Sequence, residues 1–199
     1  ETLGVTEQDN EYFYLLLEHP VPFIPNIKVQ RNELSSIQQG TLDSDFRVNK
    51  KVFAASSTVQ TDIDLSHTDA TLYYELLDNW ISADVGVTLR KFDGVLSALD
   101  LDTQELDHID VDQTLPLIYA KAQFDLPFSG LSAAVEANVL SYDGNNISDY
   151  SAKLSYTFDG ALDASIDLGL KGMQLKLKED GVHTNLETSG PFIAARLTF

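Results

Sequence analysis

The sequence predicts an all-β protein with one antiparallel up-and-down β-barrel domain over residues 1–199. Three observations support this prediction. Apolar and polar residues alternate with a period of two in nine segments, whereas helical spacing is almost absent. Short links with proline or glycine alternate with longer polar links. The 199 residues are 43% hydrophobic, which suits one barrel domain and argues against disorder.

Strands are expected, in chain order, at residues 12–18, 26–32, 67–76, 81–90, 115–126, 131–139, 148–158, 161–171 and 190–199. The segment ISADVGVTLR illustrates the pattern, because Val85 and Leu89 share one face while Asp84 and Arg90 share the other. After Gly172 the apolar residues change parity, so a β-bulge is expected there.

The last segment, GPFIAARLTF, is an apolar strand that ends on Phe199. An unpaired strand edge of this kind promotes aggregation. We therefore expect this strand to pair with the first one and to close a barrel.

The links between strands differ in length at the two ends of the predicted sheet. Tight turns are expected at 19–26, 76–79, 126–130 and 158–161, and long polar loops at 33–66, 92–113, 141–148 and 178–190. Outer-membrane barrels have this layout, with short periplasmic turns and longer extracellular loops.

The polar faces of the strands carry ionisable residues of both signs. They are Glu18, Lys28, Asp69, Glu75, Asp84, Arg90, Lys121, Glu136, Lys153, Asp163, Asp167, Lys171 and Arg196. Seven acids against six bases is nearly neutral, although the chain has a net charge of -18. A solvent-facing surface needs no such balance, so we expect these groups to meet in a largely salt-bridged lumen. The apolar faces would then point outward into lipid.

The acidic surplus and the aromatic residues lie at opposite ends of the strands. Residues 93–112 contain seven acids and no Lys or Arg, which predicts acidic extracellular loops. The apolar face becomes aromatic toward the tight turns, at Phe23, Tyr74, Trp80, Phe124, Phe128, Phe158 and Phe199. This distribution predicts an interfacial aromatic girdle at the turn end.

The predicted number of strands depends on parity. Single-chain bacterial barrels have an even number of strands, and nine segments alternate. We expect ten strands, the N-terminal one being incomplete or missing in ETLGVTEQDN, with eight as the alternative.

Composition excludes several classes of protein. The chain has no cysteine, which excludes disulfides, zinc–thiolate sites and cysteine nucleophiles. Thirteen basic against 31 acidic residues argue against a nucleic-acid partner. No stretch approaches the roughly 20 apolar residues of a membrane helix. The segment that begins at Glu1 is polar and lacks the features of a signal peptide. A mature or trimmed chain would look the same.

Five blocks of the sequence are distinctive: LEHPVPFIPNIKVQ (17–30), DLSHTDATLYYELLDNW (64–80), LPLIYAKAQFDLPFSGLS (115–132), SYDGNN (141–146) and GPFIAARLTF (190–199). They resemble bacterial outer-membrane β-barrel proteins of the GlyGly type, a family of uncharacterised function. The resemblance runs nearly end to end and implies a barrel in a Gram-negative outer membrane, without an activity. It also implies a glycine-rich first strand, of which ETLGV would be the remnant. The closing aromatic resembles the signal that the barrel-assembly machinery recognises.

Two groups of residues are candidates for chemistry. His67 and Asp69 share a face near the loop end of their strand, as a base and its orienting carboxylate would in a hydrolase. Alternation alone also makes such neighbours, and a hydrogen bond in the lumen is the simpler interpretation. The carboxylates of Asp100, Asp102, Asp107 and Asp110 are candidate ligands for divalent cations. Their spacing is not that of a calcium loop, so a solvated acidic surface near lipopolysaccharide is favoured.

The sequence therefore predicts an outer-membrane barrel without a cofactor or a defensible catalytic residue. Its role would be structural or interactive, or that of a narrow passive solute channel, because a barrel of about ten strands is nearly filled by its side chains. A hydrolase that uses His67 and Asp69 is the alternative, and a soluble lipid-binding barrel is the third hypothesis. Expected partners are outer-membrane lipid, lipopolysaccharide, the barrel-assembly machinery and divalent cations at the acidic loops.

Overall fold

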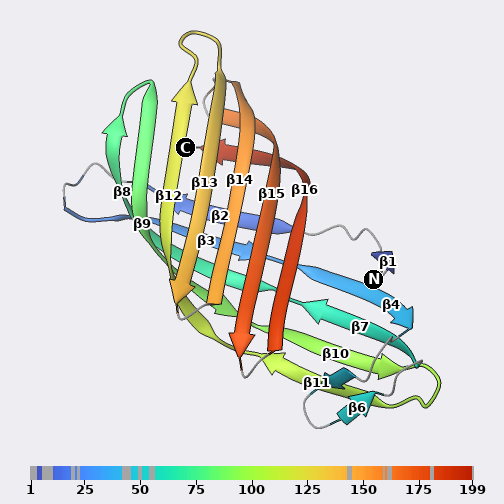
Figure 1. Cartoon of the computed structure of the whole chain (residues 1–199). Coiled ribbons are helices and arrows are strands. Elements are labelled where there is room, and N and C mark those ends of the chain that lie inside the picture. The colour runs from blue at the N-terminus through green and yellow to red at the C-terminus, as the bar shows by residue number, and fades with distance from the viewer. Residues whose placement is uncertain are drawn as a thin grey trace. The chain divides into compact units, whose positions relative to one another are not determined.

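The computed structural model is all-β, with antiparallel strands and no helix among the residues it describes (Figure 1). These are residues 4–5, 11–18, 21, 23–41, 46–48, 51–53, 57–142, 145–158, 160, 163–179 and 182–198. In this part of the chain no helix has the length and apolar character needed to cross a membrane.

Nine strands are hydrogen-bonded into a main sheet in the order β16-β15-β14-β13-β12-β9-β8-β3-β2. Their bounds are β2 (Tyr12–Leu17), β3 (Asn26–Asn32), β8 (His67–Asp78), β9 (Ile81–Phe92), β12 (Thr114–Asp125), β13 (Leu131–Tyr142), β14 (Asn145–Phe158), β15 (Asp163–Glu179) and β16 (Val182–Thr198). All nine segments that alternate in the sequence are strands of this sheet, so that prediction is confirmed. The predicted tenth strand and the closure of the sheet are not confirmed by the described residues.

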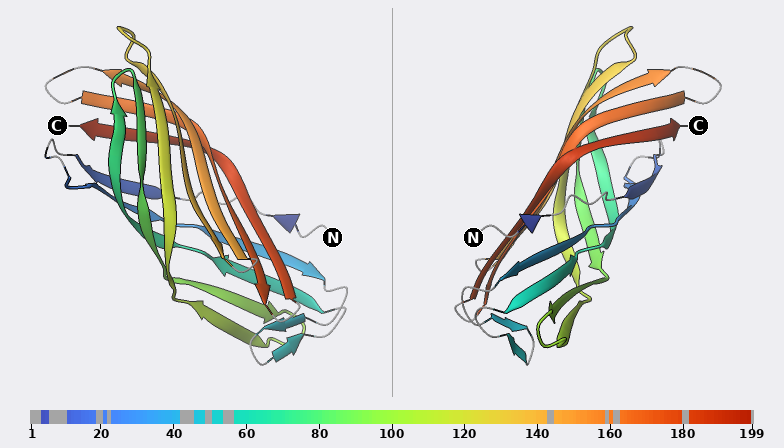
Figure 2. Two further views of the ribbon diagram at one scale, coloured as in Figure 1. Left: turned by 60° about the vertical axis from the view of Figure 1, so that its left-hand side comes forward. Right: turned by 90° about the vertical axis from the view of Figure 1, so that its right-hand side faces the viewer.

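The chain divides into two compact units. The first consists of Glu1–Leu17, Lys28–Ala70 and Leu89–Leu115, and the second of Glu18–Ile27, Thr71–Thr88 and Pro116–Phe199. In the second unit, β12 to β16 form a curved antiparallel sheet in continuous register (Figures 1 and 2). Curvature of this kind follows from the twist of long antiparallel strands.

The continuous register overturns the bulge predicted at Gly172. This residue pairs with Tyr150 on one side and with Ser189 on the other, without an extra residue. The ring of Tyr150 lies over Gly172, because a Cβ atom there would come within 2.7 Å of the ring. Met173 and Leu175 therefore continue the alternation and lie on the polar face, where both are buried.

The four predicted long loops are wrong, because these segments are largely strands. Residues 33–66 and 92–113 contain β4 (Ser35–Thr41), β5 (Phe46–Val48), β6 (Lys51–Phe53), β7 (Thr58–Asp64), β10 (Gly94–Asp100) and β11 (Leu106–Val111). With β1 (Gly4–Val5), four of them form a five-stranded sheet in the order β1-β4-β7-β10-β11, and β5 pairs with β6. Segments 141–148 and 178–190 are the ends of two hairpins. These strands carry many polar residues and so lack the apolar alternation that marks a strand in the sequence.

In the first unit, the chain passes from the five-stranded sheet to the nine-stranded sheet, and back, with hardly any residues in between. Strands β7 and β8 are separated only by Leu65 and Ser66, and β9 and β10 only by Asp93. Backbone hydrogen bonds bridge these breaks, from Leu65 N to the oxygen of Leu34 at 2.8 Å and from Asp93 N to the oxygen of Ser66 at 3.1 Å. The breaks are therefore ordered bends, in which buried amides keep a partner.

Gly94 permits a close backbone approach at one of these bends. A Cβ atom at this position would lie 2.0 Å from the carbonyl oxygen of Asp64. Because that obstacle is backbone, we expect Gly94→Ala to lower the free energy of unfolding by about 1–3 kcal/mol. Urea unfolding of the refolded protein measures this loss. Gly190→Ala is the matched control, since nothing lies within 4 Å of its added Cβ, and an equal loss in both variants would contradict the prediction.

Candidate functional site

Two ion pairs form on the polar face of the second unit. Lys121 Nζ lies 3.2 Å from Asp84 Oδ2, and Lys153 Nζ lies 2.6 Å from Asp167 Oδ2. The side chains of both aspartates are only 1% exposed. A buried carboxylate needs a cation beside it, so these pairs make burial of the polar face tolerable. Both pairs join residues of the predicted charged set.

A chain of hydrogen bonds crosses the same face. Thr71 and Thr88 join their hydroxyls at 2.7 Å, Thr88 donates to Asn138 Oδ1 at 2.7 Å, and Asn138 Nδ2 donates to Asp149 Oδ1 at 3.0 Å. Sequence reasoning missed this network because it counted ionisable residues alone. The signal was present, since threonine and asparagine occupy polar-face positions of these strands.

Tyrosines are the partners of two further acids. Tyr73 donates to Glu18 Oε1 at 2.9 Å, and Tyr119 donates to Glu136 Oε2 at 3.3 Å. The two tyrosine rings pack together at 5.7 Å. The remaining predicted charges of this unit are Glu75, Asp163, Lys171 and Arg196, of which Arg196 Nη2 donates to Ser165 Oγ at 3.3 Å. Glu18 and Glu75 are exposed, in contrast to Asp84 and Asp167.

In the first unit, Arg90 and Asp69 form a bidentate ion pair. Arg90 Nε donates to Asp69 Oδ1 at 2.8 Å and Nη2 donates to Oδ2 at 2.6 Å. Both side chains are buried, and the guanidinium also lies 5.9 Å from the centre of the Phe92 ring. Paired donors of this geometry give the strongest protein ion pairs. Lys28, the other predicted base of this unit, lies 5.6 Å from the ring of Tyr14.

His67 is held by groups other than Asp69. Its Nδ1 lies 2.8 Å from the carbonyl oxygen of Leu65, and its Nε2 lies 3.1 Å from Asn32 Nδ2. The first contact assigns the ring proton to Nδ1, so Nε2 accepts from the amide of Asn32. Both oxygens of Asp69 accept from Arg90 instead. This geometry lends no support to a hydrolytic base–carboxylate pair. Instead, His67 connects Asn32 of β3 to the bend between β7 and β8.

The four candidate metal ligands do not converge. Asp100 Oδ1 accepts from the backbone of Asp102 and Thr103, and Asp102 Oδ2 accepts from the backbone of Thr58. Asp107 and Asp110 lie on β11 opposite Ala98 and Val95. Among the described residues, no group of three or more histidines, aspartates or glutamates has the arrangement of a metal site.

Asp100 closes the β10–β11 turn as a carboxylate. The backbone N–H groups of Thr103 and Asp102 hold the pKa of its carboxyl below the usual value. A lowered folded-state pKa contributes stability above the pKa of the unfolded chain, and this contribution is lost as pH falls through the folded-state pKa. We expect Asp100→Asn to be less stable than the wild type at about pH 7 and equal to it at about pH 2, well below the usual aspartate pKa. Urea unfolding at several pH values tests this, and a pH-independent difference would contradict it.

Aromatic residues gather at the turn end of the second unit. Trp80 and Phe124 pack edge to face at 5.4 Å, as do Tyr156 and Phe158 at 4.7 Å. Tyr74 donates its hydroxyl to the carbonyl oxygen of Phe23 at 3.0 Å. Phe199, the last member of the predicted girdle, lies outside the described residues.

Two phenylalanines occupy turn positions that favour glycine. Phe128 has φ 63° and Phe23 has φ 70°, and each follows a proline in the sequence. Ser129 N donates to the oxygen of Leu126 at 3.3 Å, which places Phe128 third in a β-turn. Positive φ costs a bulky residue about 1–3 kcal/mol. Both side chains are completely or almost completely exposed, at 109% and 93%, so this strain is maintained while it displays an aromatic ring to the surroundings.

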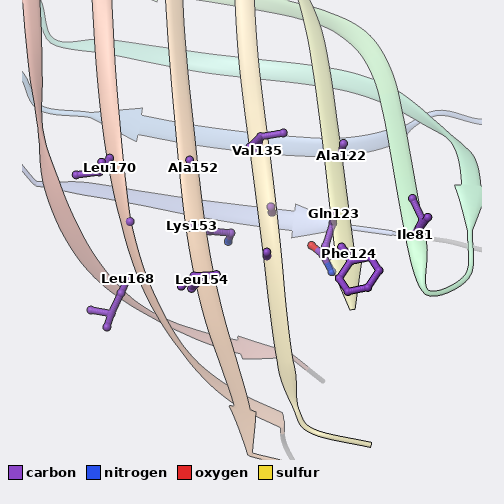
Figure 3. A pocket seen from close by; sticks show the side chains of 13 residues that line it. Ile81, Ala122, Gln123, Phe124, Val135, Ala152, Lys153, Leu154, Leu168 and Leu170 are labelled. Carbon is purple, nitrogen blue, oxygen red and sulfur yellow. The ribbon is translucent and has the colours of Figure 1, made fainter. Parts of the chain in front are cut away.

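A shallow apolar depression of about 650 Å³ lies on the apolar face of the second unit (Figure 3). Small side chains form its floor, because Ala122, Ala133 and Ala152 lie on three neighbouring strands. Bulky residues such as Leu154 and Leu168 surround them. Its lining is mostly apolar, with Gln123 and Lys153 as the polar members.

The apolar face as a whole is exposed. Val85, Val135 and Leu168 are 42%, 56% and 57% exposed, whereas polar-face side chains such as Asp84 and Asp167 are buried. A soluble protein rarely exposes a contiguous apolar surface of this kind. Comparison with protein-family models, with curated proteins and with solved structures yielded no match to this chain.

Proposed function

We propose that this chain is an integral β-barrel of the bacterial outer membrane, with a lipid-facing exterior and a largely blocked, salt-bridged lumen. One observation carries the proposal: large apolar side chains are exposed on one face of the sheet while ionised side chains are buried on the other. A soluble lipid-binding barrel requires the reverse arrangement. Because a barrel of about ten strands is nearly filled by its side chains, the proposed role is structural or interactive rather than that of a general porin.

The height of the apolar face supports this proposal. Apolar positions alternate over nine residues in neighbouring strands, for example 116–124 in β12, 131–139 in β13, 150–158 in β14 and 164–172 in β15. A tilted strand needs about 9–11 residues to cross the hydrocarbon of a bilayer. Strands β15 and β16 have 17 residues each, so they would extend beyond the membrane at one end.

The remaining expectations rest on the same proposal. The family resemblance, the contact with lipopolysaccharide and the recognition of β16 by the barrel-assembly machinery stay predictions. A narrow solute conduit is the related alternative, since it differs only in whether water threads the lumen. Divalent cations would have to bind to single carboxylates such as those of Asp107 and Asp110, because the described residues contain no cluster of ligands for a defined site.

Reconstitution into lipid tests the proposed function. We expect the refolded protein to float with liposomes after alkaline washing and to migrate differently on gels when unheated and heated, as closed barrels do. If the protein were monodisperse and native without detergent or lipid, the proposal would be wrong. The matched control is the same protein denatured in urea, which should not float.

Replacing Phe128 in its strained turn is expected to change stability and membrane anchoring in opposite directions. Phe128→Gly removes the strain, so we expect it to raise the free energy of unfolding in detergent by about 1 kcal/mol. The same change removes an exposed ring, so less of the variant should stay with liposomes during washing. Phe128→Ala is the control, since it loses the ring but keeps a Cβ at positive φ. Weakened anchoring with no gain in stability for Phe128→Gly would refute the assignment of strain.

A further inference from the structure

Both faces of the sheet reverse their polarity at one level of the second unit. On the polar face, Leu140, Ile147, Leu175 and Leu186 lie directly opposite one another on β13, β14, β15 and β16. Leu117 precedes Ile118, whose partner is Val139, so it lies beside Leu140 on the same face. We call these five residues the apolar row. Below them, the same face carries the polar groups and ion pairs described above.

The apolar face changes in the opposite sense at the same level. Ser148, Gln174 and Glu187 are cross-strand neighbours, and so are Ser141, Asn146 and Lys176. Farther along the same strands, toward the turn end, this face carries large apolar residues such as Leu154, Leu168 and Ile193, which lie opposite one another. The strand extensions therefore present to the exterior the kind of surface that faces water.

Three of the five side chains of the apolar row are buried. Leu117 is 1% exposed, Ile147 5% and Leu175 8%, and Met173, one position below the row, is 7% exposed. Leu140 and Leu186 are half-buried. Apolar side chains that meet in this way exclude water. In a closed barrel, apolar side chains from five adjacent strands at one level would make the lumen narrower at that level.

We propose that the apolar row is a hydrophobic seal at the loop end of the lumen, and that it blocks the passage of water and ions. This inference rests on the proposed function, because a lumen exists only in a closed barrel. A hydrophobic constriction stops conduction by dewetting, without any need to fill the cross-section. The salt-bridged part of the lumen would thereby be cut off from the exterior, and solute passage would require displacement of the row.

Cysteine labelling in liposomes tests the seal, and the chain has no cysteine of its own. We expect a membrane-impermeant thiol reagent to react with Gln174→Cys and to spare its neighbour Leu175→Cys on the opposite face. Equal reaction rates at the two positions would overturn the seal. Leu168→Cys should be protected by lipid, and its reaction in folded protein would overturn the proposed function instead. The two failures are therefore distinguishable.

Planar-bilayer conductance gives the second measurement. We expect the wild type to conduct negligibly and the double variant Ile147→Ser/Leu175→Ser to conduct roughly tenfold more or better, because hydroxyls rewet the constriction. Ala134→Ser is the matched control, since it adds a hydroxyl to a buried position of the same face. Free conduction by the wild type, or a double variant that floats with liposomes but stays silent, would overturn the seal. Where the double variant does not fold, either single variant serves with the same criteria.

Discussion

Arg90→Ala is expected to destabilise the protein by about 3–5 kcal/mol, the largest effect of any single substitution considered. The change removes both donors of the bidentate pair and leaves the carboxylate of Asp69 with its side chain only 6% exposed. A buried charge without a partner costs far more than the pair itself contributes. The midpoint of urea unfolding in detergent measures the loss.

Arg31→Ala is the matched control for this substitution. Arg31 pairs with Asp93 at 2.6 Å in the same unit, but the side chain of Asp93 is 46% exposed and stays hydrated when its partner is lost. We expect a loss of at most about 1 kcal/mol here. The double variant Asp69→Leu/Arg90→Met should recover most of the stability lost in Arg90→Ala, because no charge is then buried alone. Equal losses for Arg90→Ala and Arg31→Ala would contradict the argument.

Leu168→Arg is expected to cost about 2–4 kcal/mol in lipid, the value for a cation on the lipid-facing side of a barrel near the midplane. Leu168 is 57% exposed and lies between Leu154 and Ile193 on the neighbouring strands. In water, an exposed leucine tolerates arginine within about 0.5 kcal/mol. The loss of stability caused by Leu168→Arg therefore distinguishes a barrel that is surrounded by lipid from one that is surrounded by water.

Gln174→Arg is the control for depth in the bilayer. It lies on the same strand and the same face as Leu168, in the part where that face has become polar. We expect a cost of about 0–1 kcal/mol, as for cations near the interface. Folding into liposomes, followed by urea titration, compares the two variants. Tolerance of both arginines in lipid would refute the lipid-facing assignment of this face.

The sequence already determined which residues lie together on a face. Alternation is a local property of an extended chain, because successive side chains point to opposite sides. The positions of the nine strands and the separation of Leu168 from Asp167 could therefore be predicted without knowledge of any neighbour. The same criterion missed the polar strands β4, β7, β10 and β11. Their sequences resemble loops, because neither face of these strands follows a clear apolar pattern.

The tertiary structure alone decided which side chains meet. Asp69 accepts from Arg90 and not from His67, and Thr88 reaches Asn138 across an intervening strand, because these contacts depend on register between distant segments. The apolar row was hidden for the same reason. Leu140, Ile147, Leu175 and Leu186 look unrelated along the chain and become neighbours only when four strands are paired in one register. A period of two assigns a face to each residue, whereas hydrogen bonds between strands assign its partner.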